Sequence, residues 1–176
     1  MAIEGVSQTL KVLYVPDYVA SDKRLKATAE LRRKLGYLLP SYNISLAIAE
    51  GPFEDSDGIG AHFEAKALGG PSPQKQINGL KVDLHVSTAQ LARHAVQHMP
   101  RLIVGEGQGG IIATAYGHPG CLEQVLATRN VQPQELSSIA QAWGNVAGIV
   151  IHEPRLSKKG IPVSYTHLTL PTMLMV

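Results

Sequence analysis

The sequence predicts an α/β protein, a three-layer α/β/α sandwich with a mostly parallel sheet. Four short apolar runs alternate with segments of helical periodicity, and the runs occupy residues 10–15, 44–49, 102–104 and 147–151. Strands buried on both faces have such continuous apolar runs, and their alternation with helices is typical of parallel sheets. Right-handed crossovers around a central first strand predict the spatial order second, first, third, fourth.

A first helix is predicted after the first strand. Ser21 or Asp22 can cap its N-terminus, and the helix is expected to continue through Leu35, with Gly36 and Pro40 ending it. Its apolar stripe is predicted to comprise Leu25, Ala29, Leu31 and Leu35.

Three further helices are predicted. One runs from Ser87 or Thr88 to Met99, the second covers residues 109–116, and the third covers residues 135–143. Residues 54–80 are rich in Gly, Pro, Ser and Asp and show little periodicity. This composition indicates a long loop or a lid-like excursion.

The most informative motif is Gly-Glu-Gly-Gln-Gly-Gly at residues 105–110, between the third apolar run and an apolar helix. A strand–turn–helix junction aims backbone N–H groups at one point. One interpretation is a nucleophile elbow, usually Gly-x-Ser-x-Gly. The other is a dinucleotide-binding loop, because Gly105, Gly107 and Gly110 also satisfy Gly-x-Gly-x-x-Gly. We favour the elbow, since dinucleotide loops usually follow the first strand and Glu106 would repel a pyrophosphate.

On these motifs, residues 10–160 resemble the α/β-hydrolases, most closely the small serine esterases, thioesterases and phospholipase–carboxylesterases. Residues 103–110 are similar to their Ile-Val-Gly-His-Ser-Gln-Gly-Gly, with Glu106 in place of His and Gly107 in place of Ser. Residues 49–53 look like the strand end and Gly-Pro turn that lead into their substrate pocket. Pro16-Asp17 stands where they carry a His-Gly-type turn. The resemblance implies a partial α/β-hydrolase fold.

The absence of Ser at position 107 predicts a chain without serine-hydrolase turnover. The elbow of this family holds a side-chain oxygen in a strained turn, and the N–H of the next residue, here Gln108, donates to the oxyanion. Glycine adopts the required positive φ more easily than serine. The family's acid and His follow the fourth strand, and His152 is the one candidate partner here. We therefore expect an inactive ligand-binding or scaffold domain of a longer protein.

A ligand site is predicted at the carboxyl ends of the strands, where parallel α/β sheets bind their ligands. The residues expected to converge there are Pro16, Asp17, Gly51, Pro52, Glu106, Gly107, Gln108 and His152, and the helix beginning with Gly109 and Gly110 would add its positive end. Because Glu106 opposes an anion, a neutral acyl or ester-like ligand is expected, with no cofactor.

Composition, net charge and cysteine content indicate which partners and which cell compartment to expect. Hydrophobic residues make up 44% of the 176, charged residues 17%, and the net charge is +2. The basic stretch from Lys23 to Lys34 is interpreted as a solvated helix face, so neither a nucleic-acid nor a membrane partner is expected. The single cysteine, Cys121, and the absence of a signal-peptide pattern favour the cytoplasm.

The histidines could suggest a metal site, because His94 and His98 share a helical face at i, i+4. No interposed Glu and no third ligand accompany them, so surface or rim histidines are favoured and no metal is expected. His118 is assigned to the C-terminal end of the helix that follows the elbow.

The C-terminal residues are expected to be foreign to the protein. Residues 163–172 resemble a translated sequencing adapter. The chain is therefore divided into one truncated domain, residues 1–162, and a non-native tail, residues 163–176.

Overall fold

The computed structural model describes residues 8–17, 21–54, 60–63, 72–128 and 131–154. Its main sheet has four parallel strands in the order β2-β1-β5-β6. The strands are β1 (Gln8–Val15), β2 (Tyr42–Ile48), β5 (Leu102–Glu106) and β6 (Gly148–His152). The predicted order, second, first, third, fourth, is confirmed.

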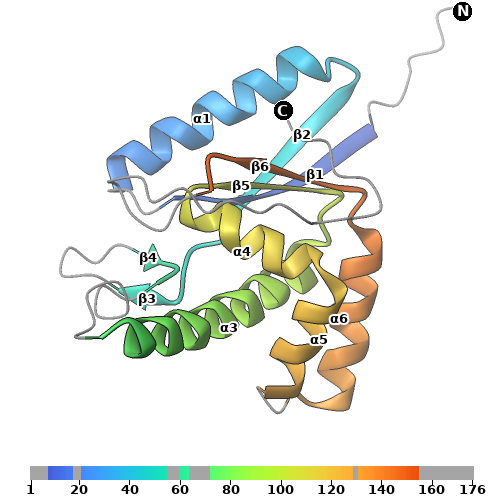
Figure 1. Ribbon diagram of the computed structural model, residues 1–176. Coiled ribbons are helices and arrows are strands. Elements are labelled where there is room, and N and C mark those ends of the chain that lie inside the picture. The colour runs from blue at the N-terminus through green and yellow to red at the C-terminus, as the bar shows by residue number, and fades with distance from the viewer. Residues whose placement is uncertain (1–7, 18–20, 55–59, 64–71, 129–130, 155–176) are drawn as a thin grey trace, which may run out of the picture.

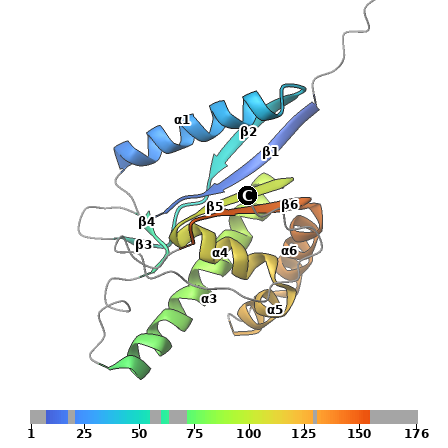
Figure 2. The same ribbon diagram turned by 45° about the horizontal axis from the view of Figure 1, so that its top comes forward.

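Helices cover both faces of this sheet, so the three-layer α/β/α prediction is confirmed (Figures 1 and 2). Helix α1 (Ser21–Leu38) lies on one face. The other face carries α3 (Pro73–His98), α4 (Gln108–Gly117), α5 (Pro119–Thr128) and α6 (Pro133–Asn145).

Two apolar clusters hold the layers together. The larger lies between the sheet and helices α3 to α6 and includes Leu13, Ile103 and Ile112, all fully buried. The smaller lies between the sheet and α1, where Leu35 packs with Val12 and Val104. Every residue of α4 is buried, which makes it the central helix of the larger layer. Because apolar burial is the main stabilising term in folding, α4 fixes the position of the turn that precedes it.

The prediction for the first helix was wrong in two respects. The helix continues through Gly36 to Leu38, because one exposed glycine costs a helix only about 1 kcal/mol. Leu25 is 68% exposed and Ala29 is also exposed, so neither belongs to the buried stripe, whereas Leu35 does.

The prediction of a long loop over residues 54–80 was also wrong at both ends. A small antiparallel hairpin, β3 (Phe53–Glu54) with β4 (Gly60–Ala61), begins it. Helix α3 starts at Pro73, well before Ser87, with the Ser72 side chain accepting from the N–H of Lys75. The first turns of α3 are largely exposed and lack an apolar stripe, so the hydrophobic periodicity of the sequence did not predict them. Helix α5 was not predicted.

The proposed domain boundary after residue 162 and the tail from Val163 lie outside the described residues. No described helix is both long and apolar enough to span a bilayer.

Candidate functional site

The carboxyl ends of the four parallel strands lie along one edge of the sheet. In register, Tyr14 is opposite both Ile48 and Val104, and Glu106 is opposite His152. The segments that follow these strand ends carry most of the predicted site residues. This edge is therefore the candidate site.

Gly107 forms the turn between β5 and α4 with φ 55° and ψ −120°. This is a left-handed φ that glycine adopts without strain. Its N–H donates to the carbonyl of His152 at 3.1 Å, and its own carbonyl accepts from the N–H of Gly110, also at 3.1 Å. The junction thus has the strand–tight turn–helix form of an elbow, with a glycine at its apex.

Asp17 fills the space above that apex. Its Oδ1 accepts a hydrogen bond of 2.9 Å from the backbone N–H of Gln108, the first residue of α4. A Cβ added to Gly107 would overlap the Asp17 carboxyl. The carboxyl group therefore occupies the space that a side chain at position 107 would enter, and it engages the N–H predicted to serve an oxyanion.

The next two glycines of the turn pack against other parts of the chain. A Cβ on Gly109 would overlap the carbonyls of Val15 and Pro16. A Cβ on Gly110 would lie 3.1 Å from the side chain of Ile151. Both positions bring α4 close to the sheet, and the prediction that they also contact a ligand stays a prediction.

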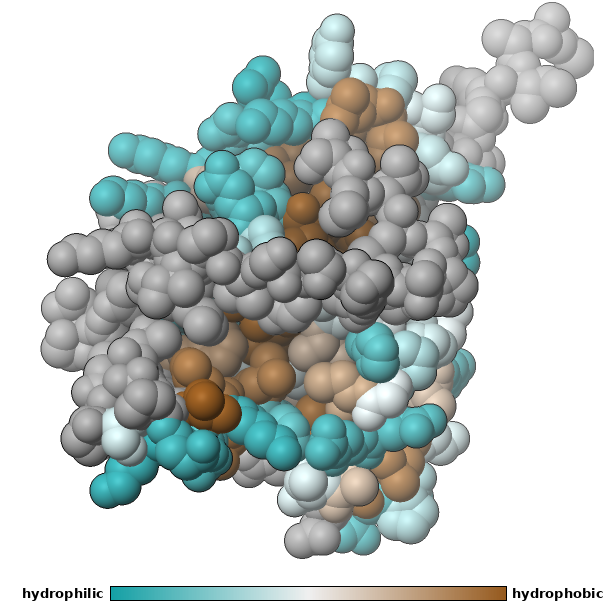
Figure 3. All heavy atoms as spheres, in the orientation of Figure 1, coloured by the Kyte–Doolittle hydropathy of each residue, from teal (hydrophilic) through white to brown (hydrophobic). Residues whose placement is uncertain are grey.

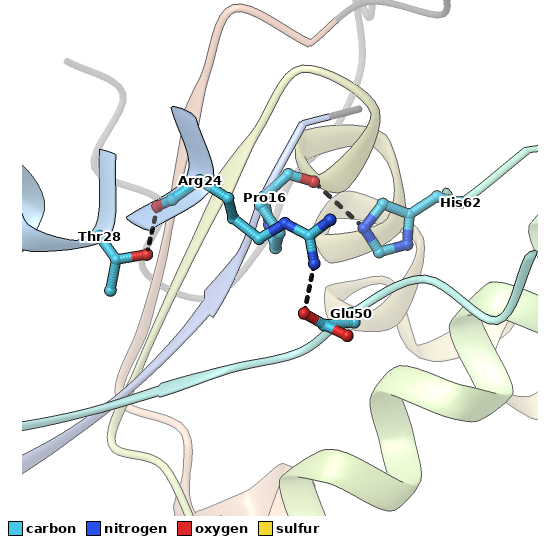
Figure 4. A network of polar contacts seen from close by, with 5 residues as sticks. All are labelled: Pro16, Arg24, Thr28, Glu50 and His62. Carbon is cyan, nitrogen blue, oxygen red and sulfur yellow. Dashed lines mark hydrogen bonds and ion pairs between the residues drawn. The ribbon is translucent and has the colours of Figure 1, made fainter. Parts of the chain in front are cut away.

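His62 joins three parts of this edge and was not singled out from the sequence. Its ring Nε2 lies 3.1 Å from the carbonyl of Pro16, as Figure 4 shows. Its backbone N–H donates to the side-chain oxygen of Gln108, and its carbonyl accepts from the hydroxyl of Ser87 at 2.6 Å. Burial lowers the pKa of His62 to about 4, against the opposing effect of the Pro16 hydrogen bond, so the ring is neutral at pH 7.

Arg24 is a second buried polar residue at this edge. It extends from α1 across the end of β1 and forms an ion pair with Glu50, which follows β2 (Figure 4). Only 7% of Arg24 is exposed. Gly51, the next residue, lies against the backbone of Ala61, which places the β2 exit beside the segment that carries His62.

Glu106 lies between a buried phenol and an exposed imidazole. The hydroxyl of Tyr14 donates to its Oε2 at 2.6 Å, and Nδ1 of His152 is 3.7 Å from its Oε1. Burial raises the pKa of Tyr14, and the hydrogen bond and charge of Glu106 raise it further. The Glu106 carboxylate is therefore held at the sheet edge, where it opposes an anionic ligand.

The structure thus brings most of the predicted residues to one edge, in two contacting sets. In the first set, Asp17 is hydrogen-bonded to Gln108 directly, and Pro16 is linked to Gln108 through His62. In the second set, Glu106 contacts His152. Gly51 joins the first set through Ala61, whereas Pro52 is exposed. Arg24 and His62 have no local motif around them, because their role arises only when α1 and the hairpin pack at the strand ends.

The other histidines have structural partners. The rings of His94 and His98 stack with centroids 6.5 Å apart, and the described residues contain no group of three or more metal-ligating side chains. His118 is the C-cap of α4, as predicted, and its backbone N–H donates to the carbonyls of Thr114 and Ala115. Its Nδ1 also accepts from the N–H of Cys121, in the following helix, at 3.2 Å.

No protein-family model and no curated protein matches this chain. The geometry of the site itself therefore carries the functional argument.

Proposed function

We propose that this chain is a domain of the α/β-hydrolase type that does not hydrolyse esters and acts as a binding or scaffold domain of a longer protein. The single observation that best supports this proposal is the position of the Asp17 carboxylate. It accepts the hydrogen bond of the Gln108 N–H, and it occupies the space that a side chain at position 107 would need. The parallel sheet and the strand–turn–helix junction agree with the proposed family.

The same carboxylate argues against acyl transfer. An oxyanion hole needs N–H donors aimed at the position where negative charge develops. Here the donor already holds a negative charge, which would repel a second one in a largely buried setting. A neutral acyl or ester-like ligand at this N–H would have to displace Asp17.

A dinucleotide site is the alternative, and two charges oppose it. Asp17 lies at the N-terminus of α4, where a pyrophosphate would bind, and the Glu106 carboxylate precedes the turn. Glycine spacing alone supports the alternative, and two of these glycines, Gly107 and Gly110, lie against Asp17 and Ile151.

The proposed location is the cytoplasm. The one cysteine of the chain, Cys121, is half-buried and has no disulfide, as is usual in a reducing compartment.

Fluorophosphonate labelling and hydrolysis of a short-chain ester test the proposed inactivity. We expect neither labelling nor turnover, and we expect Gly107→Ser to gain little or no esterase activity because the Asp17 carboxyl already occupies the space that the new hydroxyl would need. Circular dichroism would verify that the variant folds. Labelling of any serine in the unmodified chain, or substantial turnover by Gly107→Ser, would overturn the proposal.

A further inference from the structure

Helix α1 has an outward face that no other described element covers. It is the one described helix on its side of the sheet, where it packs mainly against β2 (Figure 1). Between Lys23 and Lys34 the exposed residues include five cations and a single anion, Glu30, which pairs with Lys34 at 2.9 Å. Figure 3 shows hydrophilic side chains over this helix.

The last turn of α1 adds an aromatic side chain to this basic face. Tyr37 is 85% exposed, more than any other large apolar or aromatic residue described. At about 100° of rotation per residue, Lys26, Arg33 and Tyr37 fall within roughly 40° of one another around the helix. The Tyr37 ring thus lies in line with Lys26 and Arg33, on the side of the helix opposite the buried Leu35. Glu30 lies in the same line, and its carboxylate is paired with Lys34.

We propose that the outward face of α1 binds single-stranded nucleic acid. Lys26 and Arg33 would contact the phosphates, and a base would stack on Tyr37. Single-strand binding sites combine a positive track for the backbone with aromatic rings on which bases stack, and they need no sequence-specific hydrogen bonds. This partner differs from the expectation drawn from composition, because the exposure of Tyr37 supplies the aromatic that the basic stretch lacked.

The arrangement fits this partner better than an anionic membrane or an acidic protein. The exposed Leu25 and Leu38 are separated by roughly 140° around the helix, so they do not form the single apolar face that inserts into a bilayer. An acidic protein surface would match the charges but does not require an aromatic ring in line with them, whereas a nucleobase stacks on such a ring.

Fluorescence anisotropy with a labelled single-stranded oligonucleotide of mixed sequence tests the proposal on the full chain. We expect binding that weakens steeply between about 50 and 200 mM salt. Lys26→Gln with Arg33→Gln should weaken it about tenfold and flatten its salt dependence. Tyr37→Ala should weaken it at least about fivefold, and Tyr37→Phe should keep it, because stacking needs only the ring.

The matched control removes the same charge from another surface. Lys75 and Lys81 are exposed on α3, on the opposite side of the sheet, so Lys75→Gln with Lys81→Gln should leave the affinity within about twofold. Circular dichroism would verify that each variant folds.

Three results would overturn the proposal. The first is no binding at the lowest salt. The second is equal weakening by the α3 control pair. The third is polyglutamate or phosphatidylserine vesicles binding as tightly as the oligonucleotide, with the same sensitivity to the α1 variants.

Discussion

The Asp17 carboxylate caps helix α4 from 91 positions away in the chain, through its 2.9 Å hydrogen bond with the N–H of Gln108. The residue at the N-cap itself, Gly107, has no side chain with which to accept this bond. A helix N-terminus leaves N–H groups without intrahelical partners, and a carboxylate satisfies them well because its negative charge faces the positive end of the helix. The end of β1 therefore supplies what the turn lacks.

Removing this cap should destabilise the domain. We expect Asp17→Ala to lower the free energy of unfolding by about 1–3 kcal/mol, since a buried N–H loses a charge-assisted bond. Asp17→Asn should cost less, because its amide oxygen still accepts. Urea unfolding followed by circular dichroism measures both. Equal stability of all three proteins would show that the bond contributes little.

A side chain at position 107 should conflict with Asp17. We expect Gly107→Ser to lower the stability by about 2 kcal/mol or more, from the positive φ together with the overlap at the carboxyl. In a double-mutant cycle, Gly107→Ser should cost less in an Asp17→Gly background, because the overlap is gone and only the backbone strain remains. Strictly additive costs would contradict the proposed competition for space.

The fold was largely predictable from the sequence. The apolar runs predict the buried strands, and the right-handed crossovers between them predict the order of the strands in the sheet. Short apolar runs such as Val12–Val15 are typical of strands buried on both faces, and the order of the strands followed from the crossovers. The start of α3 was not predictable from periodicity, because its first turns bury little and only the pair Ser72-Pro73 marks it.

The candidate site was predictable only in part. The elbow turn and the strand ends carry local motifs, so their position could be inferred. The contacts of Asp17, Arg24 and His62 could not, since each joins segments far apart in the sequence. A buried polar contact of that kind depends on tertiary packing and has no periodicity of its own.

Glu106 should control the titration of Tyr14. We expect Glu106→Gln to bring the pKa of the Tyr14 phenol downward, because it removes the negative charge that receives the phenol's hydrogen bond. NMR of ring-labelled tyrosine, up to the highest pH at which the domain stays folded, compares how far the Tyr14 phenol ionises in the two proteins. Tyr116 is the internal control, since burial alone raises its pKa. A Tyr14 pKa unchanged by the substitution would rule out the contact with Glu106.

Acid should destabilise the domain through His62. Its folded-state pKa, about 4, lies below the unfolded value of about 6.5, so the unfolded chain binds the extra proton first. The stability that His62 contributes is therefore complete above about pH 6.5 and is lost as the pH falls toward 4, by on the order of 3 kcal/mol. Urea unfolding at a series of pH values should show this loss in the unmodified protein and a shallower one in His62→Gln, which cannot take up the proton. If His62→Gln retained the full acid dependence, other groups would carry it, and the ring at Pro16 would be a packing contact only.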